Sequence, residues 1–252
     1  MKSYLKFRQL FEGFDLNSED QIIFTPGENE LNVDTSFNFK KLPTRNFNTA
    51  GLPVYYAYKG INKDPDLKKV DIQYALKGYS KSNYKFATGE KEKFLKRTAI
   101  YFQKFLKEKA IDTVLIMGSS SNLNNELAIE LNKRLQGINI FDNIINKALD
   151  ISKIKFVPKE GMSEITIKNN NRLIQRAVEK GEFKIKSIHP QFRTQMIDWL
   201  EIKNDFNVEK HITNKNILII DDYLTTGSSL LEASRILKLL NPKSTVGLVL
   251  FK

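Results

Sequence analysis

Two short apolar runs, residues 113–117 and 216–220, constrain the fold of this chain most strongly. Each has the length of a strand and is apolar on both of its faces, as in strands buried inside a parallel sheet. Each leads into a loop of small and hydroxylated residues and then into a segment with helical spacing, at 125–136 and 229–240. Strand–loop–helix units in this order predict right-handed parallel crossovers and a doubly wound sheet.

Further elements extend this pattern on both sides. Apolar residues recur at helical spacing over 91–109, with lysines between them, which predicts an amphipathic helix. Strands are predicted at 141–145 and 245–251. We therefore expect an α/β fold built on a doubly wound, mostly parallel five-stranded sheet.

The chain divides into two regions by composition. Residues 1–90 are rich in turn residues and aromatics, and we predict a hood or appendage there, with a strand at 54–58 and a helix at 67–77. Residues 91–252 are predicted to form the α/β core. Within this core, residues 150–210 form a long polar loop insertion with a helix over 170–180, which is either a mobile functional loop or an ordinary surface excursion.

Composition excludes several classes of protein and site. The 252 residues contain no cysteine and only His189 and His211, which excludes a disulfide scaffold, a thiolate zinc site, a cysteine nucleophile and a histidine-rich metal site. No apolar run is long enough to span a membrane, so we expect no membrane partner and a cytoplasmic location. The 40 basic residues exceed the 29 acidic ones, for a net charge of +11. This excess favours phosphate-bearing partners, including nucleic acid, or reflects a lysine-rich solvated surface.

The stretch 217–229 carries the most chemical information. Four apolar residues precede Asp221 and Asp222, which places two adjacent carboxylates at the carboxyl end of a buried strand, where open α/β sheets bind ligands. Because adjacent carboxylates repel, sugar hydroxyls or a divalent cation are the expected partners. The following loop is small and hydroxylated, Gly227 permits a tight turn, and the helix behind it offers N–H groups to an anion. The stretch therefore predicts a site for a ribose 5-phosphate group.

This stretch resembles the signature with which type I phosphoribosyltransferases bind phosphoribosyl pyrophosphate (PRPP). That signature has four apolar residues, two acids, two variable residues and then Thr/Ala-Thr-Gly-x-Ser/Thr, and every position fits here. The resemblance implies that Asp221 and Asp222 hold the ribose hydroxyls, directly or through Mg²⁺, and stabilise positive charge at the anomeric carbon. It also implies that the following loop holds the 5′-phosphate, through Tyr223, Leu224, Thr225, Thr226, Gly227, Ser228 and Ser229.

The resemblance extends more weakly to two other loops. In the family, the loop after the first core strand binds pyrophosphate, and here that loop contains Gly118, Ser119, Ser120 and Ser121. A plain strand-to-helix turn is the alternative. A flexible loop of the family closes over the site and supplies a cation. In this chain that loop is expected within residues 150–205. Arg193 is our candidate for that catalytic role, and the other candidates are Lys184, Lys186 and His189.

Base recognition in this family comes from a hood, which in this chain must lie in residues 1–90. Aromatic residues of that segment either stack on a base or pack against the core; they are Tyr55, Tyr56, Tyr58, Tyr74, Tyr79, Tyr84 and Phe86. The layout is also loosely similar to the competence protein F branch, in residues 56–60, 75–78 and 124–128. The cysteine zinc ribbon with which that branch usually starts is missing here.

Two classes of function follow from these observations. The first is an enzyme that transfers the 5-phosphoribosyl group from PRPP to a nucleobase-like acceptor with release of pyrophosphate, with Mg²⁺ as cofactor and a homodimer as a possible assembly. The second is a non-catalytic regulator that binds PRPP or a nucleotide and engages nucleic acid. A macromolecular or modified-nucleotide acceptor would combine the two.

Overall fold

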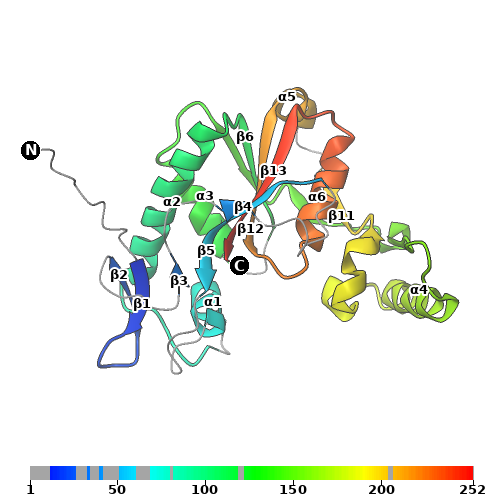
Figure 1. Cartoon of the computed structure of the whole chain (residues 1–252), viewed down its shortest axis with the longest axis horizontal. Helices are drawn as coiled ribbons and strands as arrows, with labels where there is room; N and C mark the ends of the chain where they lie inside the picture. Colours follow the sequence, from blue (N-terminus) through cyan, green and yellow to red (C-terminus); the bar gives the residue numbers. More distant parts are fainter. Residues whose placement is uncertain are drawn as a thin grey trace, which may run out of the picture.

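A five-stranded parallel sheet forms the centre of the molecule (Figure 1). The computed structural model describes residues 12–26, 33–34, 40–41, 51–60, 69–79, 82–118, 122–203 and 207–251. The parallel strands, in spatial order, are β5 (Val54–Gly60), β13 (Ser244–Phe251), β12 (Asn216–Tyr223), β6 (Thr113–Ile116) and β7 (Asn139–Asp142). This confirms the predicted α/β class and its five-stranded sheet. Two short strands, β3 (Val33–Asp34) and β4 (Lys40–Lys41), pair antiparallel with β5.

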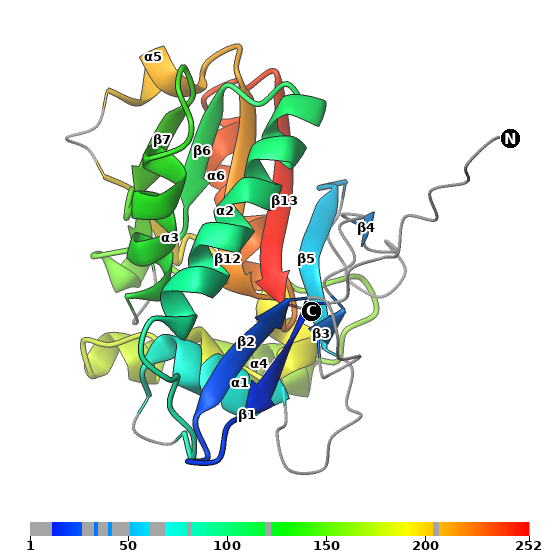
Figure 2. The same ribbon diagram turned by 90° about the vertical axis from the view of Figure 1, so that its left-hand side faces the viewer.

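Helices cover both faces of the sheet (Figures 1 and 2). α2 (Glu90–Glu108) and α3 (Leu123–Asn132) lie on one face, and α6 (Ser228–Lys238) lies on the other. In β12, Leu218 and Ile220 belong to the core under α2 and α3, while Ile217 and Ile219 belong to the core under α6. All four are fully buried, which explains why this run is apolar at consecutive positions.

The edge strand β5 comes from the segment that we predicted as a hood. Its main chain pairs in parallel with β13, from Val54 against Gly247 to Tyr58 against Phe251. The core sheet therefore takes its fifth strand from residues 1–90. The strand predicted at 141–145 is instead divided between β7 and β8 (Ile145–Lys147). The chain turns between these two strands because Asn143 adopts a left-handed backbone conformation with φ of 53°.

The remaining N-terminal elements lie against α2 and the carboxyl ends of the strands. β1 (Glu12–Leu16) and β2 (Ile22–Pro26) form an antiparallel hairpin, and the rings of Phe14 and Phe24 pack on Phe94 of α2 at centroid distances of 5.2 and 5.7 Å. α1 (Lys69–Lys77) lies below the arrowhead of β13 in Figure 2.

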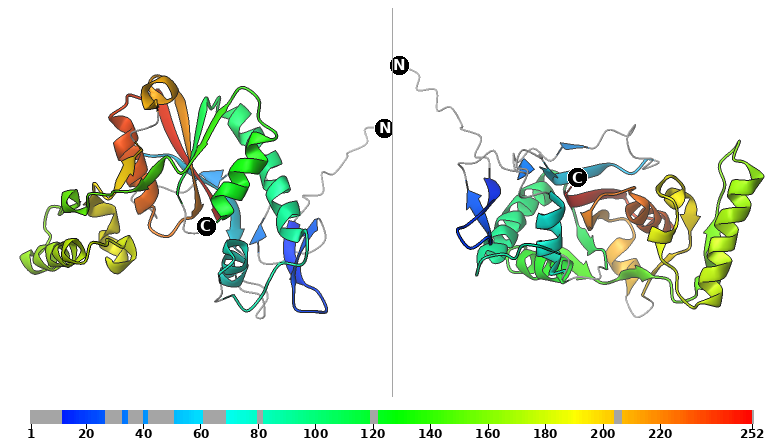
Figure 3. Two further views of the ribbon diagram at one scale, coloured as in Figure 1. Left: turned by 180° about the vertical axis from the view of Figure 1, so that it is seen from behind. Right: turned by 90° about the horizontal axis from the view of Figure 1, so that it is seen from below.

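Residues 151–197 form a separate lobe, which we call the insertion lobe. Its two-stranded stem is the antiparallel pair of β9 (Lys155–Phe156) and β10 (Met196–Ile197). Just outside the lobe, β8 pairs antiparallel with β11 (Leu200–Ile202). The lobe contains α4 (Glu164–Glu179) and the short 3₁₀ helices η1 (Ile151–Lys153), η2 (Ile185–Ser187) and η3 (Pro190–Gln195). The segment that we predicted as a long loop is thus largely folded, and α4 projects at the edge of the molecule (Figure 3).

Local capping explains where α4 lies. It begins six residues before the predicted helix because the Ser163 side chain accepts the N–H of Thr166, and it ends before Gly181, whose φ is 67°. A short helix, α5 (Val208–Ile212), leads back to β12. Within the described residues, the helices are all too short or too polar to cross a membrane.

Candidate functional site

The site lies where the winding of the sheet reverses. β6 is followed by α3 on one face and β12 is followed by α6 on the other, so the loops that leave these adjacent strands diverge. Such a switch point opens a crevice outside the carboxyl ends of the strands, which is where open α/β sheets bind ligands. The two loops that resemble PRPP- and pyrophosphate-binding loops leave these two strands.

Asp221 and Asp222 lie at the end of β12. Asp221 is paired in register with Val249, and the strand ends one residue after Asp222, at Tyr223. Asp222 is 8% exposed, and its backbone N–H donates to Oδ1 of Asp221 at 2.9 Å. The strand therefore holds both carboxyl groups in one small region, as their adjacency in the sequence predicted.

Lys77, the last residue of α1, contacts this acidic pair. Its Nζ lies 2.6 Å from Oδ2 of Asp222, with side chains 18% and 11% exposed, and 5.8 Å from the centroid of the Tyr79 ring. Lys77 is not among the site residues predicted from the sequence, because nothing in the sequence links a lysine at the end of one helix to a carboxylate 145 residues later. The one local signal is that Lys77 stands directly before Gly78, which ends α1 with φ of 67°.

The acidic pair is electrostatically strained. Burial of the Asp221 carboxyl and the negative charge of Asp222 raise the pKa of Asp221 from its ordinary 3.8 to about 7. The N–H of Asp222 and the positive charge of Lys77 act in the opposite direction but do not offset this rise. A site that raises the pKa of a carboxyl in this way favours a ligand that brings a proton, a hydroxyl donor or a positive charge.

The loop after β12 has the geometry of an anion site. Gly227 precedes α6 in a left-handed conformation with φ of 73°, which a residue with a Cβ adopts at a cost. The Thr226 hydroxyl lies 3.1 Å from the Ser228 hydroxyl and accepts the Ser228 N–H at 3.4 Å. The first turn of α6 directs its N–H groups toward this loop, which favours a phosphate there.

Not every predicted residue of this loop exposes its side chain. Leu224 is 5% exposed and belongs to the core under α6, and its N–H donates to the carbonyl of Phe251 at 3.2 Å. Tyr223 is still part of β12, paired with Phe251. Thr225 is exposed, while Ser229 is partly buried in the first turn of α6. Contacts from these residues to a phosphate stay a prediction.

The loop after β6 begins at a crowded glycine. A Cβ on Gly118 would lie 2.9 Å from Oδ1 of Asn146 and 3.2 Å from the carbonyl oxygen of Ile145, so a side chain there requires both neighbours to shift. Asn124 of α3, only 1% exposed, donates from Nδ2 to the Met117 carbonyl at 2.7 Å and so holds the start of this loop. The predicted pyrophosphate-binding residues Ser119, Ser120 and Ser121 lie outside the described residues.

Arg193, the predicted catalytic cation, is bonded within the insertion lobe. Its Nε donates to the carbonyl of Ile188 at 2.8 Å, and a terminal nitrogen donates to the carbonyl of Lys186 at 3.1 Å. Both bonds hold the turn between η2 and η3, and neither involves the acidic pair. Lys184 pairs with Glu182 at 3.0 Å. A catalytic role for Arg193 stays a prediction that these contacts do not support.

The aromatic residues of β5 are part of the core. Tyr58 is 1% exposed, its ring lies 5.4 Å from that of Phe251, and its hydroxyl bonds Thr98 at 2.6 Å. The ring of Tyr55 packs on Phe105 at 5.1 Å. These contacts favour the packing alternative for β5. Tyr74 and Tyr79, whose rings are 5.8 Å apart, remain beside Lys77 at the end of α1.

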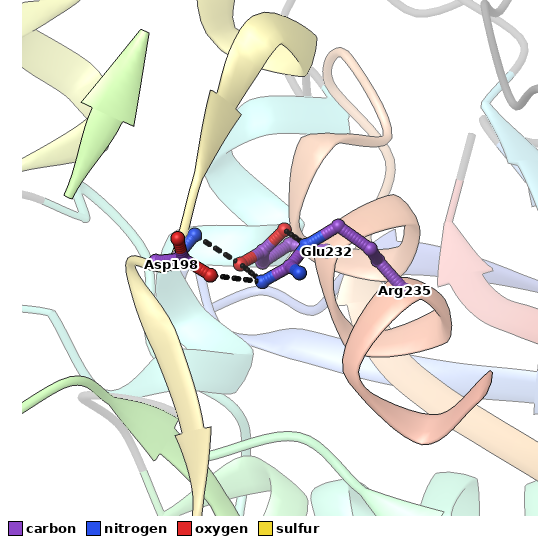
Figure 4. A network of polar contacts seen from close by, with 3 residues as sticks. All are labelled: Asp198, Glu232 and Arg235. Carbon is purple, nitrogen blue, oxygen red and sulfur yellow. Dashed lines mark hydrogen bonds and ion pairs between the residues drawn. The ribbon is translucent and has the colours of Figure 1, made fainter. Parts of the chain in front are cut away.

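A second charged network lies between α6 and the turn that precedes β11 (Figure 4). Glu232, 3% exposed, accepts the N–H of Asp198 at 2.6 Å and two bonds from the Arg235 guanidinium at 2.8 and 2.9 Å. Arg235 also bonds Asp198 at 2.6 Å. Asp198 lies in the turn between β10 and β11, so this network connects the stem of the insertion lobe to α6, the helix that follows the loop after β12.

The acidic pair also limits how a metal ion can bind. Among the described residues, no group of three or more His, Cys, Asp or Glu is arranged to hold a metal ion. The site therefore offers two carboxylates, Asp221 and Asp222. Two carboxylates suit Mg²⁺, which keeps several waters and commonly takes its other ligands from substrate phosphates.

Comparisons with known proteins give similarity to solved structures and none at the level of sequence. No protein-family model matches the sequence, and no curated protein matches it. Among solved structures, the chain is similar to the crystal structure of adenine phosphoribosyltransferase from Leishmania tarentolae, at 12% sequence identity and a TM-score of 0.36. The alignment covers 77% of this chain and 90% of the other.

Proposed function

We propose that this chain binds PRPP at the switch point between β6 and β12 and transfers its 5-phosphoribosyl group to an acceptor base. One observation carries the proposal: the stretch 217–229 folds into a buried strand that ends in two carboxylates, a left-handed glycine turn and the start of a helix. This arrangement offers acceptors to a sugar diol and N–H and hydroxyl donors to a phosphate within one continuous segment.

In this proposal, the acidic pair and the loop hold the two ends of the ribose 5-phosphate. Asp222, or Asp221 when ionised, accepts from the 2′- and 3′-hydroxyls, while the N–H groups at the start of α6 and the hydroxyls of Thr225 and Thr226 donate to the 5′-phosphate. Lys77 remains within reach of the negatively charged ligand. Fixing the ribose in this way lowers the entropic cost of bringing the anomeric carbon to the acceptor.

The transfer itself needs no covalent intermediate with the protein. The bond between the anomeric carbon and pyrophosphate breaks with both electrons leaving on the pyrophosphate. A bond from the acceptor nitrogen forms at the same carbon, and that nitrogen loses its proton to water. Negative charge on the acidic pair stabilises the positive charge that develops on the ribose. Bound Mg²⁺ would supply charge neutralisation for the departing pyrophosphate.

Calorimetric titration with PRPP and Mg²⁺, followed by an assay of pyrophosphate release with purine, pyrimidine and pyridine bases, tests this proposal. We expect wild-type binding and release with one base, and a loss of binding of at least about 100-fold when Asp221→Asn is combined with Asp222→Asn. The matched control is Glu160→Gln with Glu164→Gln, which removes two exposed carboxylates of the insertion lobe.

The outcomes separate binding from catalysis. Absent binding to wild type, or unchanged binding after the paired aspartate substitutions, contradicts the proposed site. Binding that depends on both aspartates, without pyrophosphate release for any base, contradicts transfer to a free base while supporting a PRPP-binding protein.

A further inference from the structure

The insertion lobe concentrates the positive charge of the molecule. Residues 151–197 contain ten Lys and Arg and four Asp and Glu, so the lobe carries +6 of the chain's +11 in fewer than a fifth of its residues. The lobe projects from the core on its two-stranded stem, with α4 at its edge (Figure 3). A projecting basic lobe attracts polyanions more strongly than the same charges spread over the whole surface.

One face of α4 presents these charges to solvent. Asn170 and Ile174 are buried against the lobe, and the opposite face exposes a row of cations at four-residue spacing: Lys168, Arg172, Arg176 and Lys180. In the part of the chain that the structure describes, these four make no ion pair with a carboxylate. Neighbours in the row are about 6 Å apart along the helix axis. Glu164 and Glu179 lie at the two ends of the helix.

Amide side chains lie among the cations. Asn169, Asn171 and Gln175 are exposed on the same helix. Arginine, lysine and amide side chains together are the groups that bond phosphate oxygens and base edges of nucleic acids. An anionic membrane surface offers phosphates but no base edges for these amides.

A hollow beside α4 has the size and lining for one flat polar ring. It has a volume of about 380 Å³ and lies between one side of α4, including Asn169, and the segment 186–193. Its lining contains the rings of His189 and Phe192, whose centroids are 5.8 Å apart, together with Lys186 and Arg193. An aromatic ring flanked by cations and an amide suits an unstacked nucleobase next to its phosphates.

We propose that the insertion lobe is a binding surface for single-stranded nucleic acid. The exposed face of α4 contacts successive phosphates, and one base enters the hollow and stacks on Phe192. The charged row and the aromatic hollow are independent features that lie on adjoining sides of the same helix. The proposal does not rest on PRPP binding, since none of these residues belongs to the acidic pair or the loop after β12.

Fluorescence anisotropy with labelled 12-nucleotide oligo-U RNA, oligo-dT DNA and a 12-base-pair DNA duplex, in 50 to 300 mM KCl, tests this surface. We expect the single strands to bind more tightly than the duplex, with affinity that falls steeply with salt. Arg172→Glu with Arg176→Glu should weaken single-strand binding at least about tenfold and reduce the salt slope by about 1.4, at about 0.7 per lost phosphate contact. The matched control, Lys104→Glu with Lys107→Glu on the exposed face of α2, should stay within about twofold of wild type.

A second variant addresses the hollow. Phe192→Leu keeps an apolar side chain against the core and removes the ring, and it should weaken single-strand binding about tenfold while leaving duplex binding unchanged. Three outcomes would each overturn the proposal. They are equal losses of single-strand affinity in the α4 and α2 charge-reversal variants, unchanged single-strand affinity in Phe192→Leu, and duplex binding as tight as single-strand binding. Binding to vesicles containing phosphatidylserine, without binding to any oligonucleotide at 50 mM KCl, would overturn it in favour of a membrane surface.

Discussion

Two charged clusters lie on the same strand–loop–helix unit, and they differ in how well their charges are satisfied. Between α6 and the turn that precedes β11, Glu232 is buried and accepts one backbone hydrogen bond and two from the guanidinium of Arg235. Asp198 is paired with the same guanidinium. At the end of β12, Asp222 has Lys77 as its ion-pair partner, and the pKa of Asp221 is raised to about 7 by burial and by Asp222.

The difference separates architecture from function. A network whose polar groups are all hydrogen-bonded stabilises the contact between two segments, and a ligand would add little stabilisation to it. A buried pair of carboxyl groups that repel each other is stabilised when a ligand donates to them or brings positive charge. The Asp198–Glu232–Arg235 network therefore holds the insertion lobe on α6, and we propose that the Asp221–Asp222–Lys77 cluster binds a ligand.

The pH dependence of stability should report on Asp221. Because its pKa is raised in the folded state, its contribution to stability is fully present below pH 3.8 and is lost as the pH rises through about 7. The shift of about three units corresponds to at most about 4 kcal/mol. Denaturant unfolding of wild type and Asp221→Asn between pH 4 and 8 should show the variant gaining stability relative to wild type as the pH rises. A difference between the two proteins that does not vary with pH would contradict the strain at this site.

Glu232→Ala should damage the fold and leave the ligand site largely intact. Removing the buried carboxylate leaves the Asp198 N–H and part of the Arg235 guanidinium without partners, at a cost of about 3 kcal/mol. For a chain of this size that lowers Tm by about 6 to 12 °C, which calorimetry measures. PRPP affinity of the folded protein should change less than about threefold, and a larger loss would place this network in the binding site.

Lys77→Met should have the opposite profile. Loss of the cation should weaken PRPP binding about tenfold, because a charged contact to an anionic ligand disappears. Binding of Mg²⁺ alone should become tighter, because the two carboxylates lose a competing positive charge. Calorimetric titration of each ligand measures both effects. The matched control is Lys91→Met, which breaks another 2.6 Å lysine–carboxylate pair, with Glu126, and should change neither affinity.

Gly227→Ala should have the smallest effect on stability. A Cβ at φ of 73° costs about 1 kcal/mol and shifts the loop that we expect to hold the 5′-phosphate. Gly181→Ala introduces a comparable strain, at φ of 67°, after α4. Thermal unfolding should give similar small losses for both variants, while only Gly227→Ala should weaken PRPP binding. Equal PRPP affinities in the two variants would argue against a phosphate contact in this loop.

Much of the core could be predicted because its signals are local. The fully apolar runs at β6 and β12 indicate burial on both faces, and the helices α2, α3 and α6 follow from apolar spacing over a few turns. The acidic pair and the glycine turn of the site are contiguous in the sequence as well. The edge strand β5 was recognised as a strand but assigned to the hood, because parallel pairing with β13 joins residues about 190 positions apart.

Local patterns in the chain were enough to predict the α/β class, the burial of the central strands and the functional groups between Asp221 and Ser229, because each depends on neighbouring residues. The packing of the elements places Lys77 against Asp222, bonds Arg193 within its own turn, and joins Asp198 of the insertion-lobe stem to α6. Most of these contacts join segments far apart in the chain, and a charged side chain can pair with any of many groups of opposite charge. Which partner each one takes depends on how the elements pack, which no local pattern in the sequence encodes.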